Sequence, residues 1–492
     1  MPARSAAEPG RLHACVVAAL VAASGPPAAA AVLNVPAKYA TVQAAINAAA
    51  IGDTVLLAPG VHTGRPTIPG KAITLASQYL TTGDRSLVER TILDGTAGGW
   101  ALRVLPGGDA PTIVGITIRN ADDGIRATGK FRLFDSRVTG TGDGIDYEDG
   151  SGGIVSGCLM YGNTDDAIDS DHGVNAIIVG NTLRDNGDDG IEIRLQAYSG
   201  PRLTIVIRDN LIMGNGEDGI QLISYNLDTP RTIRIERNLI LNNAMAGVGM
   251  MCCENTIENY QGADLKETVG LYNNTIVDNN HGVTGGDSLI ALNNLIMNCT
   301  NVGLKRADAG SIAAHNLFYG NGTDHTGSNV DLATTLYADP FLGPDYGLTS
   351  GSPAIDAGCS RFEHLGRVIW KMALEGFEGV APDLGAMESP ATLGVGDDPY
   401  GIADALQAVP EPSRGTTVLR FSLPAAGPAR LDILDVAGRR VRRLVDGARS
   451  AGRHEVAWDG TDSTGRLVPA GAYFARLDCA THVRTRRFVR LD

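Results

Sequence analysis

Carboxylates crowd two short stretches of the sequence. "NTDDAIDSDHG" (163–173) holds four aspartates within seven positions, and "GDDGIEIR" (187–194) follows with three more acidic residues. Like charges that lie this close destabilise a fold unless they are solvated, protonated or bound to a cation. The two stretches are therefore candidates for cation binding or acid–base chemistry.

Both stretches belong to an internal repeat. Each unit has an apolar strand, the motif N-x-[LIV], a second Asn five residues after the first and then G-[IV], as in "GNTLRDNGDDGIEI" (180–193) and "DNLIMGNGEDGIQL" (209–222). The units recur at steps of 20 to 35 residues. Such a period with insertions is typical of a solenoid, and the short apolar runs indicate strands rather than helices. We therefore expect an all-β chain whose stacked coils bury one continuous core.

The recurring asparagines are predicted to be structural. Asn tolerates left-handed turns, and its amide can bond to the copy in the next coil. The two predicted columns are Asn181, Asn210, Asn238, Asn274, Asn294 and Asn316, and Asn186, Asn215, Asn243 and Asn279.

The repeat also sets the register of the acidic residues. Alignment on the Gly-Ile pairs gives one column of Asp123, Asp143, Asp166, Asp189 and Asp218. A second column holds Arg126, Asp146, Asp169, Glu192 and Gln221, and a third holds Glu148, Asp171, Arg194 and Ile223. Alternation along a strand turns the second and third columns outward. Asp before Gly is also ordinary turn chemistry, which is the alternative explanation of the first column.

Calcium is the predicted compensation for this charge, because it takes six to eight oxygen ligands with flexible geometry. The predicted ligands are Asp146, Asp166, Asp169, Asp189 and Glu192. The ion would bridge a uronate of an anionic polysaccharide to the protein, with Arg194 as a nearby base, which is the arrangement of a calcium-assisted lyase.

Two other functions fit the same residues. Paired aspartates, with Asp166, Asp188 and Asp189 as candidates, would suit a glycoside hydrolase. A non-catalytic carbohydrate-binding or cell-surface protein would use calcium structurally. Three tyrosines in long insertions, Tyr198, Tyr225 and Tyr260, are predicted either to stack on sugar rings or to pack within their loops.

Charge is distributed unevenly along the 492 residues. The formal net charge is −14, residues 403–492 contribute +5, and residues 32–402 carry about −20. This acidity argues against nucleic acid as a partner. The same acidity would repel an anionic polysaccharide unless a cation lay between the two.

The first 31 residues read as a secretory signal peptide. Arg4 and Arg11 precede the apolar "CVVAALVAA" (15–23) and the small-residue stretch "SGPPAAAA". No apolar run of the mature region is long enough to span a bilayer. We expect a secreted, extracellular or cell-surface protein, monomeric, with buried thiols at Cys158 and Cys299 and with the bonding of Cys252 and Cys253 left open.

Residues 32–389 resemble the right-handed parallel β-helix proteins of the pectin-lyase-like superfamily. The resemblance rests on the opening "VPAKYATVQAAINAAAIGDTVLLAPGVHTG" (35–64), on the repeats, and on "LYADPFLGPDYGLTSGSPAIDAG" (336–358) with "PDLGAME" (382–388). It implies a short capping helix that buries Val42, Ala45, Ile46 and Ala49. "NTDD" and "GDDG" also resemble polygalacturonase motifs, but "EDG" (217–219) stands where that family has "GHG". The superfamily includes lyases, hydrolases, esterases and proteins without known chemistry, so the resemblance predicts the fold and not the reaction.

A polar linker is predicted at 390–402 and a second domain at 403–492. Short alternating strands, a "WDG" turn and "PAGAY" suit a small immunoglobulin-like β-sandwich with Trp458 and Tyr473 in its core. This domain resembles the FlgD-like immunoglobulin-type domain of secreted bacterial proteins, which implies contact with secretion or cell-surface machinery.

Overall fold

The computed structural model describes residues 30–254, 260–372, 377, 379–389 and, with short gaps, 406–490. The chain forms two compact units, divided between Thr392 and Leu393. The predicted signal peptide, apart from Ala30 and Ala31, and the predicted linker lie outside the described residues, so both stay predictions.

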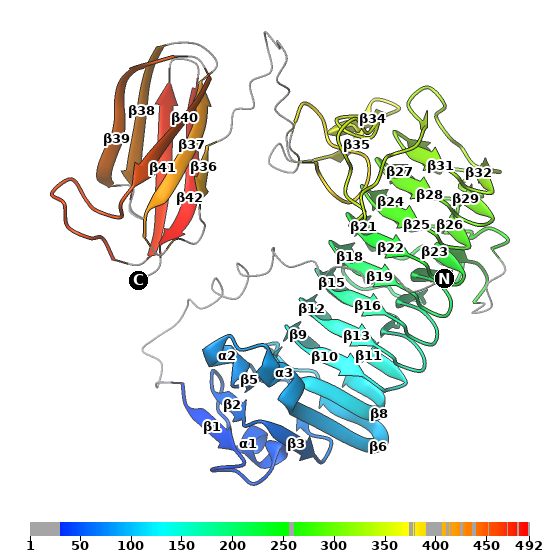
Figure 1. Cartoon of the computed structure of the whole chain (residues 1–492). Coiled ribbons are helices and arrows are strands. Elements are labelled where there is room, and N and C mark those ends of the chain that lie inside the picture. The colour runs from blue at the N-terminus through cyan, green and yellow to red at the C-terminus, as the bar shows by residue number, and fades with distance from the viewer. Residues whose placement is uncertain are drawn as a thin grey trace. The chain divides into compact units, whose positions relative to one another are not determined.

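The first unit is a solenoid of stacked coils, seen in Figure 1 as a row of parallel arrows. One sheet contains β1 (Val32–Val35), β2 (Thr54–Leu57), β5 (Thr74–Ser77), β7 (Thr112–Val114), β9 (Lys130–Phe134), β12 (Gly152–Ser156), β15 (Asn175–Val179), β18 (Leu203–Arg208), β21 (Arg231–Glu236), β24 (Thr268–Tyr272), β27 (Leu289–Leu292) and β30 (Ile312–Ala314). The second contains β3 (Gly60–Thr63), β4 (Thr67–Ile68), β6 (Thr91–Val104), β8 (Thr117–Ala127), β10 (Arg137–Thr139), β11 (Asp143–Tyr147), β13 (Leu159–Tyr161), β14 (Ile168–Ser170), β16 (Thr182–Arg184), β19 (Leu211–Met213), β22 (Leu239–Leu241), β25 (Thr275–Val277), β28 (Leu295–Met297), β31 (Leu317–Tyr319) and β33 (Leu336–Tyr337). The third contains β17 (Ile191–Leu195), β20 (Ile220–Ser224), β23 (Ala246–Met251), β26 (His281–Thr284), β29 (Val302–Lys305) and β32 (Thr323–Thr326).

Because the coils stack in register, apolar residues at the same position of successive strands form buried columns. Ile145 pairs with Ile168, and both are fully buried. The preceding glycine of each Gly-Ile pair allows the coils to approach. A Cβ on Gly144 would lie 2.4 Å from the carbonyl oxygen of Ala167 in the next coil. Most coils therefore have glycine at this position, and the coil of β14 accommodates Ala167 there.

The two predicted asparagine ladders are confirmed. Asn210 donates through Nδ2 to Oδ1 of Asn238 at 2.9 Å and to the carbonyl of Ile178 at 2.9 Å, while its own Oδ1 accepts the backbone N–H of Asn181 at 2.9 Å. The second ladder begins one coil earlier than predicted, because Asn163 Nδ2 donates to Asn186 Oδ1 at 2.9 Å. Every member of each pair is buried, so these bonds replace water inside the turns.

A helix covers the first coils of the solenoid, and a later segment packs on the outer face of its last coils. The predicted capping helix is α1 (Val42–Ala48), whose N-cap Thr41 accepts the N–H of Ala44 at 3.1 Å and whose buried residues include Val42 and Ile46. Two shorter helices, α2 (Tyr79–Thr82) and α3 (Ser86–Arg90), follow. Near the other end, Ala354 and Leu384 pack on outward residues of the second sheet, and a hairpin forms from β34 (Arg361–His364) and β35 (Arg367–Lys371).

The second unit is a small antiparallel sandwich. One sheet contains β36 (Gln407–Val409), β37 (Thr417–Leu423) and β40 (Gly452–Trp458), and the other contains β38 (Gly427–Leu434), β39 (Arg440–Arg449), β41 (Gly471–Cys479) and β42 (His482–Arg490). Trp458 is fully buried and Tyr473 is 6% exposed, so both predicted core positions are confirmed. The all-β fold class predicted from the sequence is confirmed in both units. No helix among the described residues has the length and apolar character needed to cross a membrane.

Candidate acidic site on the third face of the solenoid

The third face of the solenoid carries the predicted acidic columns. We define this face as residues 123–127 of β8, then β11, β14 and β17, and then the remaining strands of the third sheet. Asp143 pairs with Asp123, and Asp146 pairs with Asp169. Further along, Glu192 pairs with Gln221. The register predicted from the Gly-Ile pairs is therefore confirmed.

The first column forms a ladder of carboxylates bonded to backbone. Asp166 Oδ1 accepts the N–H of Asp189 at 2.7 Å, and Asp189 Oδ1 accepts the N–H of Asp218 at 2.6 Å. Asp143 Oδ1 accepts the N–H of Asp166 at 3.2 Å. The turn chemistry considered as an alternative for this column thus accounts for one oxygen of each carboxylate. It does not account for the second oxygen, since Asp189 Oδ2 is buried without a hydrogen-bond partner.

Two arginines neutralise the flanks of the acidic region. Arg126 lies 3.5 Å from a carboxylate oxygen of Asp146 and also pairs with Glu148. Arg194 pairs with Glu192 and lies 3.5 Å from an oxygen of Asp169. The charge of the second and third columns is therefore compensated in large part within the protein.

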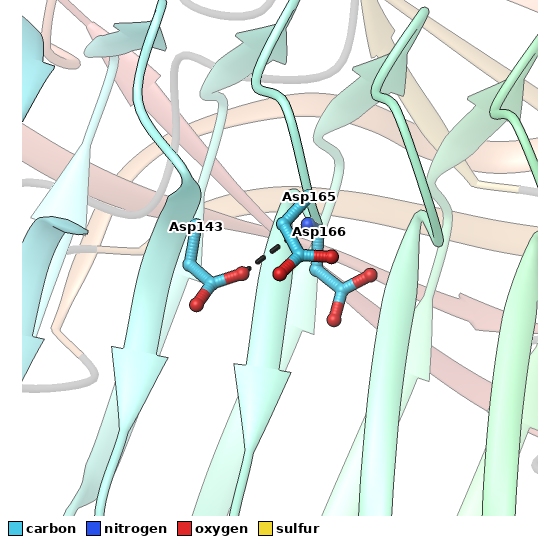
Figure 2. Close-up of side chains that lie close together, drawn as sticks. All are labelled: Asp143, Asp165 and Asp166. Atoms are coloured by element: carbon cyan, nitrogen blue, oxygen red, sulfur yellow. Dashed lines mark hydrogen bonds between the residues drawn. The ribbon is translucent and has the colours of Figure 1, made fainter. Parts of the chain in front are cut away.

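Among the described residues, three groups of carboxylates could hold a metal ion. Within each group, one oxygen of every carboxylate lies within 4.8 Å of the others. The groups are Asp143, Asp165 and Asp166; Asp166, Asp169 and Glu192; and Asp188, Asp189 and Glu217. Figure 2 shows the first group, with its three carboxylates gathered at the start of neighbouring strands. Of the five residues predicted from the sequence as calcium ligands, three lie together in the second group, Asp189 lies in the third, and Asp146 lies beside Arg126 in none of them.

The carboxylates of the first group form no ion pair with an arginine of the described residues, whereas Asp169 and Glu192 of the second group pair with Arg194. Asp143 and Asp165 lie outside the predicted ligand set, which takes Asp166 and Asp189 from the first column but not Asp143, and Asp165 belongs to none of the three columns. A bound cation would satisfy oxygens that the backbone ladder leaves over, and carboxylate oxygens are the ligands that calcium prefers. The donor set of the first group therefore fits calcium.

Burial and mutual repulsion alter the proton affinity of these groups. Burial raises the pKa of Asp143 to about 8, with a further contribution from the charge of Asp169. Burial also raises the pKa of Asp166 well above its usual range, followed by repulsion from Glu192. Glu192 itself has its pKa raised to about 8 by burial and by Asp169. The raised pKa values favour the protonated forms of these carboxyl groups unless positive charge is bound nearby.

A hollow adjoins the first group. It has a volume of about 360 Å³ and is lined by residues 121–123, 140–143, 164 and 165, so it shares Asp143 and Asp165 with the group. Burial raises the pKa of Asp165, and the charge of Asp188 and a hydrogen bond to it add to the shift. Carboxylates in such contact are closer than the roughly 6.5–9.5 Å that an inverting hydrolase requires for its water. That spacing argues against Asp165 and Asp188 as the carboxylate pair of an inverting hydrolase.

Arg194 has an environment that opposes the role of a base. Burial acts to lower the pKa of its guanidinium, but the carboxylates of Asp169 and Glu192 outweigh burial and the net pKa is raised. A more tightly held proton suits charge compensation and not proton abstraction.

The three predicted sugar-stacking tyrosines lie in different surroundings. Tyr198 is half-buried and stacks below the guanidinium of Arg231 at 5.6 Å, and Tyr225 is half-buried with its hydroxyl 3.4 Å from Gln196 Nε2. Tyr260 is only 4% exposed, and its hydroxyl donates to Asp218. The first two retain some exposed surface, whereas Tyr260 packs against Ala246 and Met251 of the solenoid and neither stacks openly nor packs within its own loop.

Cysteine chemistry plays no part in the acidic site. Cys158 and Cys299 are buried free thiols, as expected, and Cys252 and Cys253 form a disulfide between adjacent residues.

Comparisons with known proteins agree with this architecture. Residues 101–261 match the family model of the right handed beta helix region, and residues 409–480 match that of the FlgD Ig-like domain. The chain carries a right-handed β-helix region and a FlgD Ig-like domain. The resemblance stated from the sequence is thereby confirmed for both parts.

Solved structures extend the likeness along the β-helix region. The pectate lyase Pel9A is 17% identical, with a TM-score of 0.50 over 73% of this chain and 96% of that chain. The alginate lyase AlyGC of family PL6 is 13% identical, covering 78% of this chain and 60% of that chain with a TM-score of 0.33. The periplasmic alginate epimerase AlgG is 11% identical, covering 62% and 84% with a TM-score of 0.31. No curated protein sequence matches the chain. At these identities the likeness to Pel9A shows the fold, and the function has to be argued from the site.

Proposed function

We propose that the chain binds a uronate-containing polysaccharide through calcium and cleaves it by a lyase-like elimination. The observation that carries this proposal is the group of Asp143, Asp165 and Asp166 beside an open hollow. No arginine of the described residues forms an ion pair with these carboxylates, whereas Asp169 and Glu192 pair with Arg194. The solved pectate lyase with the same fold is consistent with this class of substrate.

In this proposal Asp143, Asp165 and Asp166 hold the calcium ion. Calcium, when bound, attracts the substrate carboxylate and withdraws charge from the carbon whose proton is lost. The β-helix region carries most of the net charge of about −20 in residues 32–402, so a bridging cation also removes the repulsion between the protein and an anionic sugar.

Two further residues have roles under the same proposal. Arg194 holds the charge of Asp169 and Glu192 in place and prevents them from repelling the substrate. Asp188 is the proposed proton acceptor, because it is half-buried at the equivalent turn of the next coil, and its neighbour Asp189, not Asp188, supplies the backbone ladder. An acceptor must reach the sugar proton directly, which the outer residue of the turn can do.

The test incubates the purified protein with polygalacturonate, alginate and a neutral glycan, with calcium or with a chelator. Unsaturated products, followed by their absorbance, are expected from one uronate polymer and only with calcium. Asp188→Asn is expected to abolish product formation while calcium binding, measured by calorimetry, is retained with an affinity altered by the changed contact to Asp165. Asp278→Asn, which changes an exposed turn carboxylate on another part of the solenoid, is the matched control.

Two results would overturn parts of the proposal. New reducing ends without unsaturated products would show hydrolysis in place of elimination. Calcium-dependent binding of the polymers without any product would leave a carbohydrate-binding protein and remove the catalytic role of Asp188.

A further inference from the structure

The FlgD Ig-like domain and the β-helix region carry net charges of opposite sign. Residues 403–492 contain 15 arginines, no lysine and 10 acidic residues, whereas residues 32–402 carry a net charge of about −20. The planar guanidinium of arginine presents paired donors to carboxylates and similar anions. The question is whether the structure gathers these arginines into a binding surface.

A groove of about 500 Å³ lies along the first half of β39 in this domain. One side is formed by Arg440, Val441, Arg442 and Arg443, and the other by the turn residues Asp459, Thr461, Asp462, Ser463 and Gly465. The turn is fixed to the strand, since the N–H of Ser463 donates to the carbonyl of Val441 at 3.0 Å. The groove is therefore a built feature of the fold.

Two of the groove arginines are held in place by acidic neighbours. Arg442 Nη1 donates to Asp459 Oδ1 at 2.8 Å and also to Thr461. Arg443 donates to Asp432 at 2.7 Å and to Asp446 at 2.7 Å. These bonds orient the guanidinium groups, and those of Arg442 occupy only one of its three nitrogens among the described contacts.

Two further arginines at the groove, Arg440 and Arg466, are exposed and can contact a ligand. Arg440 is exposed and forms no ion pair with any described residue. Arg466, which follows the last lining residue of the turn, is also exposed, and its side chain forms no ion pair within the described part of the domain. Exposed guanidinium groups on both sides of a polar groove provide the donors that a chain of carboxylates would accept.

We infer that this groove, flanked by Arg440 and Arg466, is a second binding site for anionic polysaccharide. It requires no calcium, because arginine supplies the positive charge that a cation supplies on the β-helix region. Both sites are on one polypeptide, so a polymer held by the groove is present at a raised effective concentration for the acidic site. The inference shares with the proposed function only the class of polymer.

The full-length protein can test this inference in the presence of a chelator, which silences the calcium-dependent site. Electrophoresis through gels that contain polygalacturonate is expected to retard the wild-type protein, and gels that contain a neutral glycan are expected not to. The apparent affinity should fall by about tenfold in Arg440→Glu/Arg466→Glu, and it should fall with rising salt because exposed charges are screened.

The control is Arg367→Glu/Lys371→Glu, which changes charge by the same amount on exposed residues of the β34–β35 hairpin. Retained binding in this control with lost binding in the groove variant supports the inference. Equal loss in both variants would show a response to net charge alone and would overturn it. No retardation of the wild-type protein in chelator would also overturn it, while leaving the calcium-dependent function to be judged separately from activity with calcium.

Discussion

Two kinds of polar ladder run along the same solenoid, one made of asparagine and one made of aspartate. Their side chains differ in one atom, the amide nitrogen of asparagine being a second oxygen in aspartate. In the asparagine ladders, each amide both donates and accepts, so that Asn238 is bonded to the coil before it and the coil after it. In the aspartate ladder of the third face, Asp166 accepts one N–H at 2.7 Å with one oxygen, as an asparagine would. Its second oxygen replaces the amide nitrogen and has nothing to donate.

The comparison shows how a repeat can acquire a site without losing its fold. The backbone bond that fixes each turn is retained in both ladders, so replacing the amide by a carboxylate leaves the stacking intact. What changes is the charge, which accumulates at about 4.8 Å intervals along the axis. In the asparagine ladders the side-chain amides find hydrogen-bond partners. In the aspartate ladder the second carboxylate oxygen of Asp189 has no donor among the described residues, so a proton or a cation is needed to compensate its charge.

The largest expected difference between the ladders is their response to pH. In a chelator, the stability of the protein should fall as pH rises from about 4 to about 8. Asp143 has its pKa raised by burial to about 8 from 3.8, so over this window the folded protein binds more protons than the unfolded chain, and higher pH favours unfolding. A shift of that size corresponds to on the order of 5 kcal/mol.

Denaturant unfolding of the full-length protein at several pH values measures this effect. Saturating calcium should flatten the pH profile, because the cation replaces the protons. A profile in chelator that is already flat would show that the carboxylates are compensated in some other way.

The next effect concerns the cation itself. Asp143→Asn/Asp166→Asn should lower calcium affinity by about a thousandfold, or ~4 kcal/mol, since two charged ligands are lost. The fold should survive, because each asparagine retains an oxygen to accept the backbone N–H now bonded to Asp143 or Asp166. Titration calorimetry gives the affinity, and Asp278→Asn serves as the control. An unchanged calcium affinity would show that the ion binds at another group of carboxylates.

Much of this comparison could be predicted from the sequence. The Gly-Ile pairs mark the same structural position in every coil, and so they predict the register by which Asp146 meets Asp169. The recurrence of Asn with a fixed offset predicts the ladders for the same reason. Period and spacing are local properties, and the stacked fold translates them directly into neighbours in space.

The membership of the cation group could not be predicted in this way. Asp146 and Asp169 occupy equivalent positions of the repeat, but Arg126 of the preceding coil pairs with Asp146. Asp165 joins the group because the turn brings it beside Asp143 of the coil before. Tyr260 lies in an insertion whose path the repeat does not specify. Ion-pair partners and loop paths depend on the three-dimensional packing of non-repeated residues, which the period does not encode.

A smaller effect is expected in the satisfied ladder. Asn210→Ala should cost about 3 kcal/mol, because it leaves the buried N–H of Asn181 and the carbonyl of Ile178 without partners. Denaturant unfolding measures the loss. Calcium affinity should not change, since no charge is altered. Asn175→Ala, at an exposed position of β15, is the control and should have little effect. A calcium defect in Asn210→Ala would show that the two ladders are not independent.

The smallest effect is a gain. Asp189→Asn converts one member of the aspartate ladder into the asparagine form, and Asn keeps the oxygen that accepts the N–H of Asp218 at 2.6 Å. Burial, and then repulsion from Asp218 and Asp166, raise the pKa of Asp189 well above its usual range, so at pH 8 the carboxyl is costly whether it holds a proton or a charge. The neutral amide removes that cost, and we expect about 1 kcal/mol of added stability in chelator.

The gain should depend on pH in a way that simple repacking would not. At pH 4 the carboxyl of Asp189 is protonated and neutral in the folded protein, and the substitution should then have almost no effect. Thermal unfolding at both pH values distinguishes the two explanations, with a rise of a few degrees expected at pH 8 alone. Equal stabilisation at both values would mean that packing, and not charge, separates the aspartate ladder from the asparagine ladder at this coil.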